Sequence, residues 1–446
     1  MISFKVALMI GFVVGVLVIE WYQNFYILYG AILVFAIFTA FEDYLRSYLE
    51  SKFLLKNPKE DAARVEHDKR RRMTYPDPIF NTWYHICDSE ELQGDRVIEF
   101  RGLGQVFALW RTKDGKPVCQ DAYCLHLGAN LAVGGKVEDN CITCPFHKWK
   151  FDEHGEVKEI PYAPEPHKCH TQKKLKTYHC VDYCGLVMIY FHADDKEPEF
   201  TLPTFIEDEI AKEGFKRHLK WDIGFKTLSP VDWVDQAGDH SHFSTLHGDF
   251  VIPWTSIPIP EWLLRLVPLR IAHSLVTYLG DDAEWEERVK KTKWGVVDKH
   301  LIFFTDRAGL TWNGKLMETT VAETVEMFVG PALMIFNIPF TIGAFKVFVS
   351  TTPTEGGSVM KVRTMVDKRV WASSWVRFIA WMLQGISASQ LNADIDIMCN
   401  KIRLKKPILV PNDGPYNRTN RWPRIFYSEG TSKVNSGCDP YKNDWQ

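Results

Sequence analysis

The sequence predicts an α+β protein in which an N-terminal membrane anchor precedes two globular units. Three observations predict this fold class. Apolar runs dominate residues 1–45, short β-rich runs separated by turns occupy residues 74–200, and helix-compatible stretches appear in residues 201–446. A chain of 446 residues is also long for one domain, so two units and an appendage are the natural expectation.

The expected anchor consists of two apolar runs, residues 6–19 and 25–41, with a short polar patch between them. Neither run reaches the roughly 20 residues of a comfortable transmembrane helix. A cleaved signal peptide is the alternative, but Glu20, Trp21 and Tyr22 follow the first run where small residues would mark a cleavage site. We therefore expect a retained anchor, as one long tilted span or as a tight hairpin.

A basic linker, residues 46–73, follows the anchor and ends in the run Lys69-Arg70-Arg71-Arg72. Lysine and arginine beside a membrane segment favour the cytoplasmic side, although a solvated linker has the same composition. We expect the chain to be held at a membrane, that of the endoplasmic reticulum, with its catalytic part in the cytosol.

Composition and motifs exclude several functional classes. The formal net charge of -3 gives no reason to expect a nucleic-acid partner. Ten cysteines are far fewer than a disulfide scaffold needs, and several lie beside histidines, which favours metal binding. The chain has no GxGxxG turn after a strand and no GxxxxGK loop, so we expect no nicotinamide, flavin or nucleotide site of its own.

The first candidate metal centre lies in two loops of the β-rich unit. Cys124 and His126 form a C-x-H pair, and Cys144 and His147 form a C-x2-H pair. Two cysteines can bind one iron and two histidines the other, which makes a [2Fe–2S] cluster of mixed ligation and raised reduction potential. The alternative is a zinc site in which Cys141 takes the place of His147.

The second candidate centre lies in the polar stretch 231–248. Asp239 and His242 are one helical turn apart, whereas His242 and His247 are about 140° out of phase on a regular helix. Both histidines can bind one metal only if the helix widens into a π-bulge or ends early, and Gly248 favours an early end. The neighbouring His240 points off this face, so we expect it to be structural.

A carboxylate would complete the two-histidine, one-carboxylate set of a non-haem Fe(II) centre with open positions for O₂. The best candidate is Asp394, which lies downstream of an aromatic helical stretch at residues 370–383, and Asp396 is the alternative. Apolar segments at residues 251–268 further suggest an apolar substrate drawn from a membrane.

Together these motifs resemble the Rieske non-haem iron oxygenases, most closely the Neverland cholesterol 7-desaturases. The resemblance covers residues 74–405 and is carried by residues 74–78, 121–131, 134–135, 144–149, 160–162 and 239–247. It implies a Rieske β-domain followed by a helix-grip catalytic domain, in which helices cover a curved antiparallel sheet. The chain departs from the family pattern at Leu125, where proline is common, and at Met398, where tryptophan is frequent.

The resemblance also implies the reaction and the assembly. The expected enzyme converts cholesterol to 7-dehydrocholesterol in steroid hormone biosynthesis, with O₂ and electrons from NAD(P)H that a separate reductase delivers. A homotrimer is implied in which His147 of one subunit faces Asp239 of the next, and Asp239 links it to His242. A hydroxylase like the bacterial 3-ketosteroid 9α-hydroxylases, and a non-catalytic Rieske electron carrier in the membrane, are the alternatives.

Overall fold

The computed structural model describes residues 74–163, 173–249, 251, 253–254, 268–280, 282–290, 298–432 and 434. The expected anchor, residues 1–45, and the basic linker, residues 46–73, lie outside these described residues. Within them, no helix is both long enough and apolar enough to cross a membrane.

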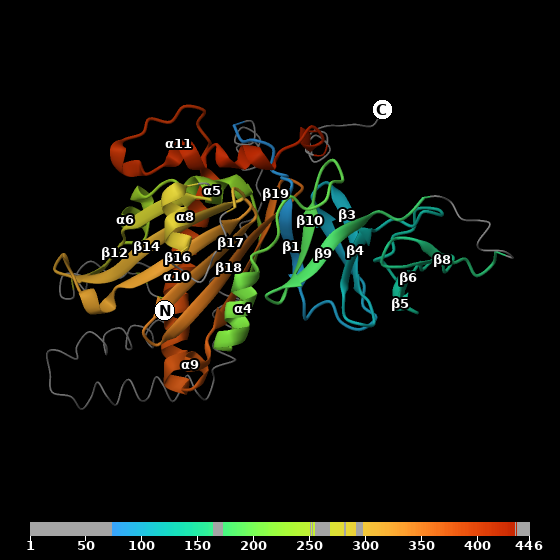
Figure 1. Cartoon of the computed structure of the whole chain (residues 1–446), viewed down its shortest axis with the longest axis horizontal. Helices are drawn as coiled ribbons and strands as arrows, with labels where there is room; N and C mark the ends of the chain where they lie inside the picture. The colour runs from blue at the N-terminus through green and yellow to red at the C-terminus, as the bar shows by residue number, and fades with distance from the viewer. Residues whose placement is uncertain are drawn as a thin grey trace, which may run out of the picture.

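The first unit consists of two antiparallel sheets. The larger sheet has the strand order β1-β10-β9-β4-β3-β2, and the smaller one has the order β5-β6-β7-β8. The smaller sheet lies at the end of the molecule farthest from the second unit (Figure 1). The strands are β1 (Thr82–Asp88), β2 (Ile98–Gly102), β3 (Gln105–Arg111), β4 (Pro117–Asp121), β5 (Lys136–Glu138), β6 (Cys141–Thr143), β7 (Lys150–Phe151), β8 (Val157–Glu159), β9 (Thr177–Tyr183) and β10 (Leu186–Phe191).

Strand β10 is apolar throughout because both of its faces are covered. Leu186, Met188 and Tyr190 belong to the core shared with the second unit, and the alternate residues Val187 and Ile189 belong to the core of the first unit. Because successive side chains point to opposite faces of a strand, the hydrophobic residues of β10 contribute alternately to two different cores.

The turn between β3 and β4 contains Asp114-Gly115, a dipeptide typical of hairpin turns. Arg111 pairs with Pro117 at the end of the antiparallel ladder, and Gly115 has a φ of 89°. Such a positive φ suits glycine, which has no Cβ to clash with its own backbone.

The second unit is a large antiparallel sheet with helices packed on it. Its main strand order is β11-β19-β18-β17-β16-β14-β12, with β13 and β15 also paired to β14. These strands are β11 (Lys216–Lys226), β12 (Leu269–Ala272), β13 (Leu275–Leu279), β14 (Leu301–Trp312), β15 (Lys315–Leu316), β16 (Ala322–Val329), β17 (Leu333–Phe340), β18 (Gly343–Thr354) and β19 (Gly357–Val366).

A long helix, α10, crosses this sheet, as the helix-grip expectation requires (Figure 1). The predicted aromatic helical stretch at residues 370–383 forms the end of α9 and the first part of α10. The helices are α4 (Thr204–Glu213), α5 (Pro230–Ala237), α6 (Ser241–Leu246), α8 (Ala283–Lys290), α9 (Lys368–Trp371), α10 (Ser374–Asn400) and α11 (Tyr416–Thr419), with 3-10 turns η3 (Glu318–Thr320), η4 (Pro411–Asp413) and η5 (Trp422–Phe426).

Polar contacts join β1 of the first unit to β11, β18 and β19 of the second. Arg363 Nε donates to Asp88 Oδ1 at 2.8 Å, and Lys220 Nζ lies 2.9 Å from Asp88 Oδ2. In the same interface, His85 Nδ1 of β1 lies 2.8 Å from Ser350 Oγ of β18. Removing one partner of such a buried ion pair typically costs about 3–5 kcal/mol, so these contacts hold the two units in a fixed arrangement.

Candidate metal centres and substrate cavity

The two cysteine–histidine loops have the same local geometry. The backbone N–H of Gly128 donates to Cys124 O at 2.9 Å, and that of Lys148 donates to Cys144 O at 3.1 Å. Gly128 and Lys148, each four residues after its cysteine, both have a positive φ, of 72° and 59°. A positive φ is costly for lysine, and such residues tend to persist at functional sites.

The four predicted cluster residues come together in the arrangement that a two-iron cluster needs. The Cys124 and Cys144 thiols are close enough to hydrogen-bond, and the rings of His126 and His147 have centroids 4.8 Å apart. Nδ1 of His126 is buried and has no hydrogen-bond partner within the described residues. A pair of thiols beside a pair of imidazoles therefore fits a [2Fe–2S] cluster with two ligands on each iron.

Neighbouring side chains support the cluster loops. The ring of Trp149 stacks on His126 with a centroid distance of 4.9 Å, and Trp149 Nε1 donates to Tyr162 Oη at 2.9 Å. Cys141, the spare cysteine, is buried on β6.

The polar stretch 231–248 forms two helices where we expected one. Helix α5 ends at Ala237 and α6 begins at Ser241. The break lies at Gly238, where a Cβ atom would come within 2.0 Å of Thr419 Oγ1 on α11. Close packing against α11 therefore turns the chain between Asp239 and His242.

The second helix ends early, which was one of the two predicted ways to bring both histidines to one metal. α6 stops at Leu246, and His247 is its C-cap with φ of -110° and ψ of -4°. A Cβ on Gly248 would lie 2.4 Å from Ser244 O, so glycine allows the chain to turn back on the helix here. The other possibility, a π-bulge, is not formed.

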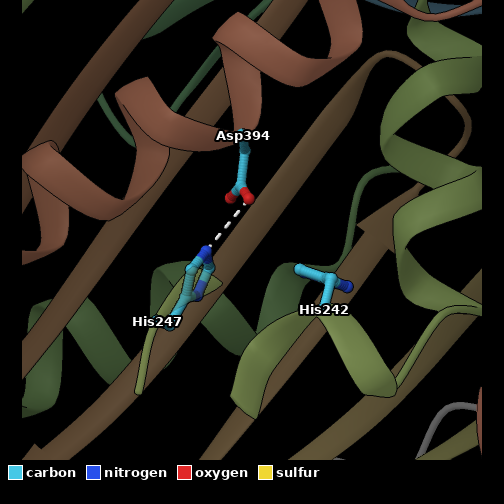
Figure 2. A group of neighbouring side chains, drawn as sticks. All are labelled: His242, His247 and Asp394. Atoms are coloured by element: carbon cyan, nitrogen blue, oxygen red, sulfur yellow. Dashed lines mark hydrogen bonds and ion pairs between the residues drawn. The ribbon is translucent and has the colours of Figure 1, made fainter. Parts of the chain in front are cut away.

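His242, His247 and Asp394 meet between α6 and α10 (Figure 2). Their candidate ligand atoms all lie within 4.8 Å of one another, and no other such group occurs among the residues that the structure describes. His247 Nε2 and Asp394 Oδ1 are 2.9 Å apart, and the two histidine rings are nearly perpendicular. Asp396 is exposed on the far side of α10. Two imidazoles and one carboxylate fit a non-haem Fe(II) centre.

His242 is oriented by the backbone just before it. Its Nδ1 lies 2.5 Å from the carbonyl oxygen of Asp239, so the ring proton is held on Nδ1 and Nε2 is left for a metal. Burial lowers the pKa of His242, which keeps the ring neutral and able to act as a ligand.

Asp239 itself faces outward. Its side chain is 45% exposed, its Oδ1 accepts the backbone N–H of Ser241 at 3.1 Å, and its Oδ2 is 3.9 Å from His242 Nδ1. The side chain of Asp239 lines a surface hollow of about 250 Å³, while the backbone carbonyl of the same residue contacts His242. His240 turns away to Thr277, with Nε2 2.7 Å from Oγ1, as expected for a structural residue.

The triad opens into a cavity of about 450 Å³ between the sheet and α10. Most of its walls are apolar, and they include Trp221, Phe243, Phe304, Phe336, Phe345 and Leu383. Most of the apolar stretch 251–268 lies outside the described residues, but Trp254 is buried in the core against Trp221 and Trp381. A cavity of this size and character suits an apolar small molecule.

Sequence reasoning missed three ionisable residues of this cavity. His273, Asp306 and Glu326 all line it, and none belongs to a motif. His273 Nδ1 lies 2.6 Å from Asp306 Oδ2, and the His273 ring is 6.2 Å from that of His247. The available signal was a charged residue on the same face of a strand as apolar residues. Asp306, two positions after Phe304, is an example.

The two candidate centres are far apart in one chain. The cluster loops adjoin the small sheet β5–β8 at one end of the molecule, whereas α6 lies near the other end (Figure 1).

Comparison with known proteins agrees with this geometry. Residues 82–179 match the model of the Rieske [2Fe-2S] domain, and residues 189–427 match that of the 3-ketosteroid 9alpha-hydroxylase C-terminal domain. A cholesterol 7-desaturase of Caenorhabditis elegans is 30% identical over 377 residues, which span 82% of this chain and 81% of that protein. The chain belongs to the cholesterol 7-desaturase family of Rieske oxygenases.

Two further similarities agree with this assignment. A cholesterol 7-desaturase of Hemicentrotus pulcherrimus is 29% identical, with 83% of this chain and 75% of that protein covered. NdmB of Pseudomonas putida CBB5 has a TM-score of 0.53 at 15% identity, and the match covers 87% of this chain and 98% of that one, which shows the shared fold. This Rieske oxygenase is an enzyme with a [2Fe–2S] cluster and a mononuclear iron, served by a separate reductase.

The choice between Asp394 and Asp396 can be tested by metal analysis. In the purified oxygenase, Asp394→Ala should lower the iron content from about three to about two atoms per chain and leave the visible spectrum of the cluster unchanged. Asp396→Ala, two positions away on the same helix, is the matched control and should retain all the iron. Loss of iron in Asp396→Ala alone would contradict the proposed ligand set.

Proposed function

We propose that this oxygenase removes the C7 and C8 hydrogens of cholesterol to give 7-dehydrocholesterol in steroid hormone biosynthesis. The reaction uses O₂ and electrons that the separate reductase takes from NAD(P)H. The observation that carries this proposal is the apolar cavity of about 450 Å³ that ends at His242, His247 and Asp394. The relatives named cholesterol 7-desaturase support the choice of substrate.

In this proposal His242, His247 and Asp394 bind the mononuclear iron. Cys124 and Cys144 bind one iron of the cluster, and His126 and His147 bind the other. When bound, the mononuclear iron activates O₂ for the removal of hydrogen from the substrate. The protein's own part is to orient His242 through the carbonyl of Asp239 and to keep water away from the reacting bond with apolar walls.

Hydroxylation of a steroid at the same site is the second candidate function. It is favoured by the match of residues 189–427 to the 3-ketosteroid 9alpha-hydroxylase domain. The two reactions share every proposed iron ligand and differ in whether the substrate gains oxygen or loses a second hydrogen.

We also propose a head-to-tail homotrimer in which the cluster of one subunit serves the iron of the next. The loops around the cluster form an apolar tip of exposed side chains: Tyr123, Leu125, Leu127, Val133, Phe146 and Tyr162. An apolar rim beside Asp239 also has exposed side chains: Ile402, Leu404, Ile408 and Val410. Exposed apolar patches of this kind mark interaction surfaces.

The tip and the rim are two different apolar surfaces of one chain, so the tip of one subunit can pack on the rim of the next. A head-to-tail contact joins two different surfaces of the same chain and closes when the rotation permits. With the tip on the rim, His147 comes to the outward carboxylate of Asp239, whose backbone carbonyl already contacts His242 Nδ1 at 2.5 Å. Asp239 then links the two metal centres.

We further propose that residues 1–45 anchor the enzyme in the membrane of the endoplasmic reticulum, with the basic linker 46–73 and both globular units in the cytosol. The support is the pair of apolar runs and the basic cluster that follows them. In the same division, residues 74–200 form the Rieske domain and residues 201–446 the catalytic domain. Recovery of the full chain in the soluble fraction of disrupted cells would contradict the anchor.

Product analysis tests the proposed reaction. Cells that express the full chain and receive cholesterol should accumulate 7-dehydrocholesterol, two hydrogens lighter than cholesterol, and His242→Ala should abolish its formation. Glu323→Gln, an exposed change on the outer face of β16, is the control and should leave the yield unchanged. A product heavier by one oxygen would replace the desaturase with the hydroxylase.

Complementation tests the path between subunits. Cys124→Ala removes the cluster and His242→Ala removes the mononuclear iron, so each variant alone should be inactive. Co-expressed, they should recover about a quarter of the wild-type activity, because one contact in four joins an intact cluster to an intact iron site in a random cyclic assembly. If the two chains copurify without any activity, the path does not run between subunits.

A further inference from the structure

The sheet side of the cavity carries a carboxyl group whose neighbours across the strands are apolar. Glu326 on β16 pairs with Phe304 on β14 and with Phe336 on β17, and Phe336 pairs in turn with Val347 on β18. All four residues line the cavity. Glu326 is only 4% exposed, so its carboxyl group is enclosed by this apolar row.

Glu326 lacks a partner in the part of the chain that the structure describes. Its Oε2 is buried without a hydrogen bond. Burial raises the pKa of Glu326 well above its ordinary value, and the nearby charges of Asp306 and Asp394 act in the same direction. Burial therefore favours the protonated form of this carboxyl group, which offers both a donor and an acceptor.

A second residue that lines the cavity, His273, also has a polar atom without a partner among the described residues. His273 Nδ1 is held by Asp306 Oδ2 at 2.6 Å, and Asp306 Oδ1 also accepts the backbone N–H of Ser274 at 3.1 Å. This leaves Nε2 of His273 as an acceptor, and it has no hydrogen bond to any described residue. Asp306 is thus occupied in orienting the imidazole, and Glu326 and His273 have free hydrogen-bonding capacity in the same wall.

We propose that Glu326, together with His273 Nε2, forms the subsite that binds the 3β-hydroxyl group of the sterol. This inference rests on the proposed function. A hydroxyl group is both donor and acceptor, which matches a neutral carboxyl and an imidazole nitrogen. The neighbours of Glu326 in this row, Phe304, Phe336 and Val347, offer apolar surface to the sterol rings.

The position of the subsite relative to the iron ligands fits the shape of the substrate. The hydroxyl is on the first sterol ring and the C7–C8 bond is in the second, so the two must bind close together. The His273 ring is 6.2 Å from that of His247, and Glu326 is near enough to Asp394 to feel its charge. The alkyl tail leaves the opposite end of the sterol and extends away from this region.

Gln384 is another polar residue of the cavity, and it also has a side-chain atom that could bind the hydroxyl. Its Oε1 lies 2.8 Å from His218 Nδ1, and its Nε2 is buried without a partner among the described residues. It lies ten residues before Asp394 on α10, about 15 Å along the helix axis at 1.5 Å per residue. That distance places Gln384 beside the tail of a sterol whose C7–C8 bond is at the triad.

The test compares a ligand with the hydroxyl and one without it. Dissociation constants for cholesterol and for cholest-5-ene, which lacks the hydroxyl, are measured with the holoenzyme in the absence of the reductase. The wild type should bind cholesterol about tenfold more tightly. Glu326→Gln should keep most of this preference. Glu326→Leu should abolish it by weakening the binding of cholesterol alone. Unchanged binding of cholest-5-ene by this variant is the control for folding.

Three results would overturn the subsite: no preference in the wild type, a preference that survives in Glu326→Leu, or a preference lost only in Gln384→Leu. Product analysis separates this inference from the proposed function. If the wild type prefers cholesterol through Glu326 but forms no 7-dehydrocholesterol, the subsite stands and the proposed reaction is wrong. If it forms 7-dehydrocholesterol without that preference, the reaction stands and the subsite is wrong.

Discussion

The buried ion pair between Asp88 and Arg363 determines how the rest of the molecule is arranged. Asp88 is at the end of β1 in the first unit, and Arg363 is in β19 of the second. Because separating them would leave an unpaired charge in the interior, the two units cannot rotate freely against each other. This arrangement keeps the cluster loops far from the triad within one chain (Figure 1). This separation is the physical reason for the proposal that electrons pass between chains.

The triad depends on close packing of segments that are distant in the sequence. Gly238 approaches α11 so closely that a Cβ atom would overlap Thr419, and this contact ends α5 before Asp239. The short helix that follows ends at Leu246 and leaves His247 beside α10. Since each of the three side chains comes from a backbone position fixed by packing, the fold itself brings them together.

Local motifs could be predicted from the sequence, and long-range arrangements could not. The C-x-H and C-x2-H loops are local, so spacing alone identified Cys124 to His147 as a cluster motif. The break in the 231–248 helix depends on Thr419, which no local pattern reveals. The sequence favoured Asp394 and kept Asp396 as the alternative, and α10 buries Asp394 and exposes Asp396. Glu326 was missed because strand alternation does not say which face encloses a cavity.

The unpartnered carboxyl in the cavity has an energetic consequence for selectivity. A buried polar group without a partner is costly to the folded protein, and a ligand that supplies the partner recovers that cost. The hydrogen bond to such a group therefore discriminates more strongly than the same bond at an exposed site. Because Glu326 is fixed in the row between Phe304 and Phe336, this bond would also fix which C–H bonds face the iron. Recognition of the sterol and the choice between hydrogen removal and hydroxylation then depend on the same contact.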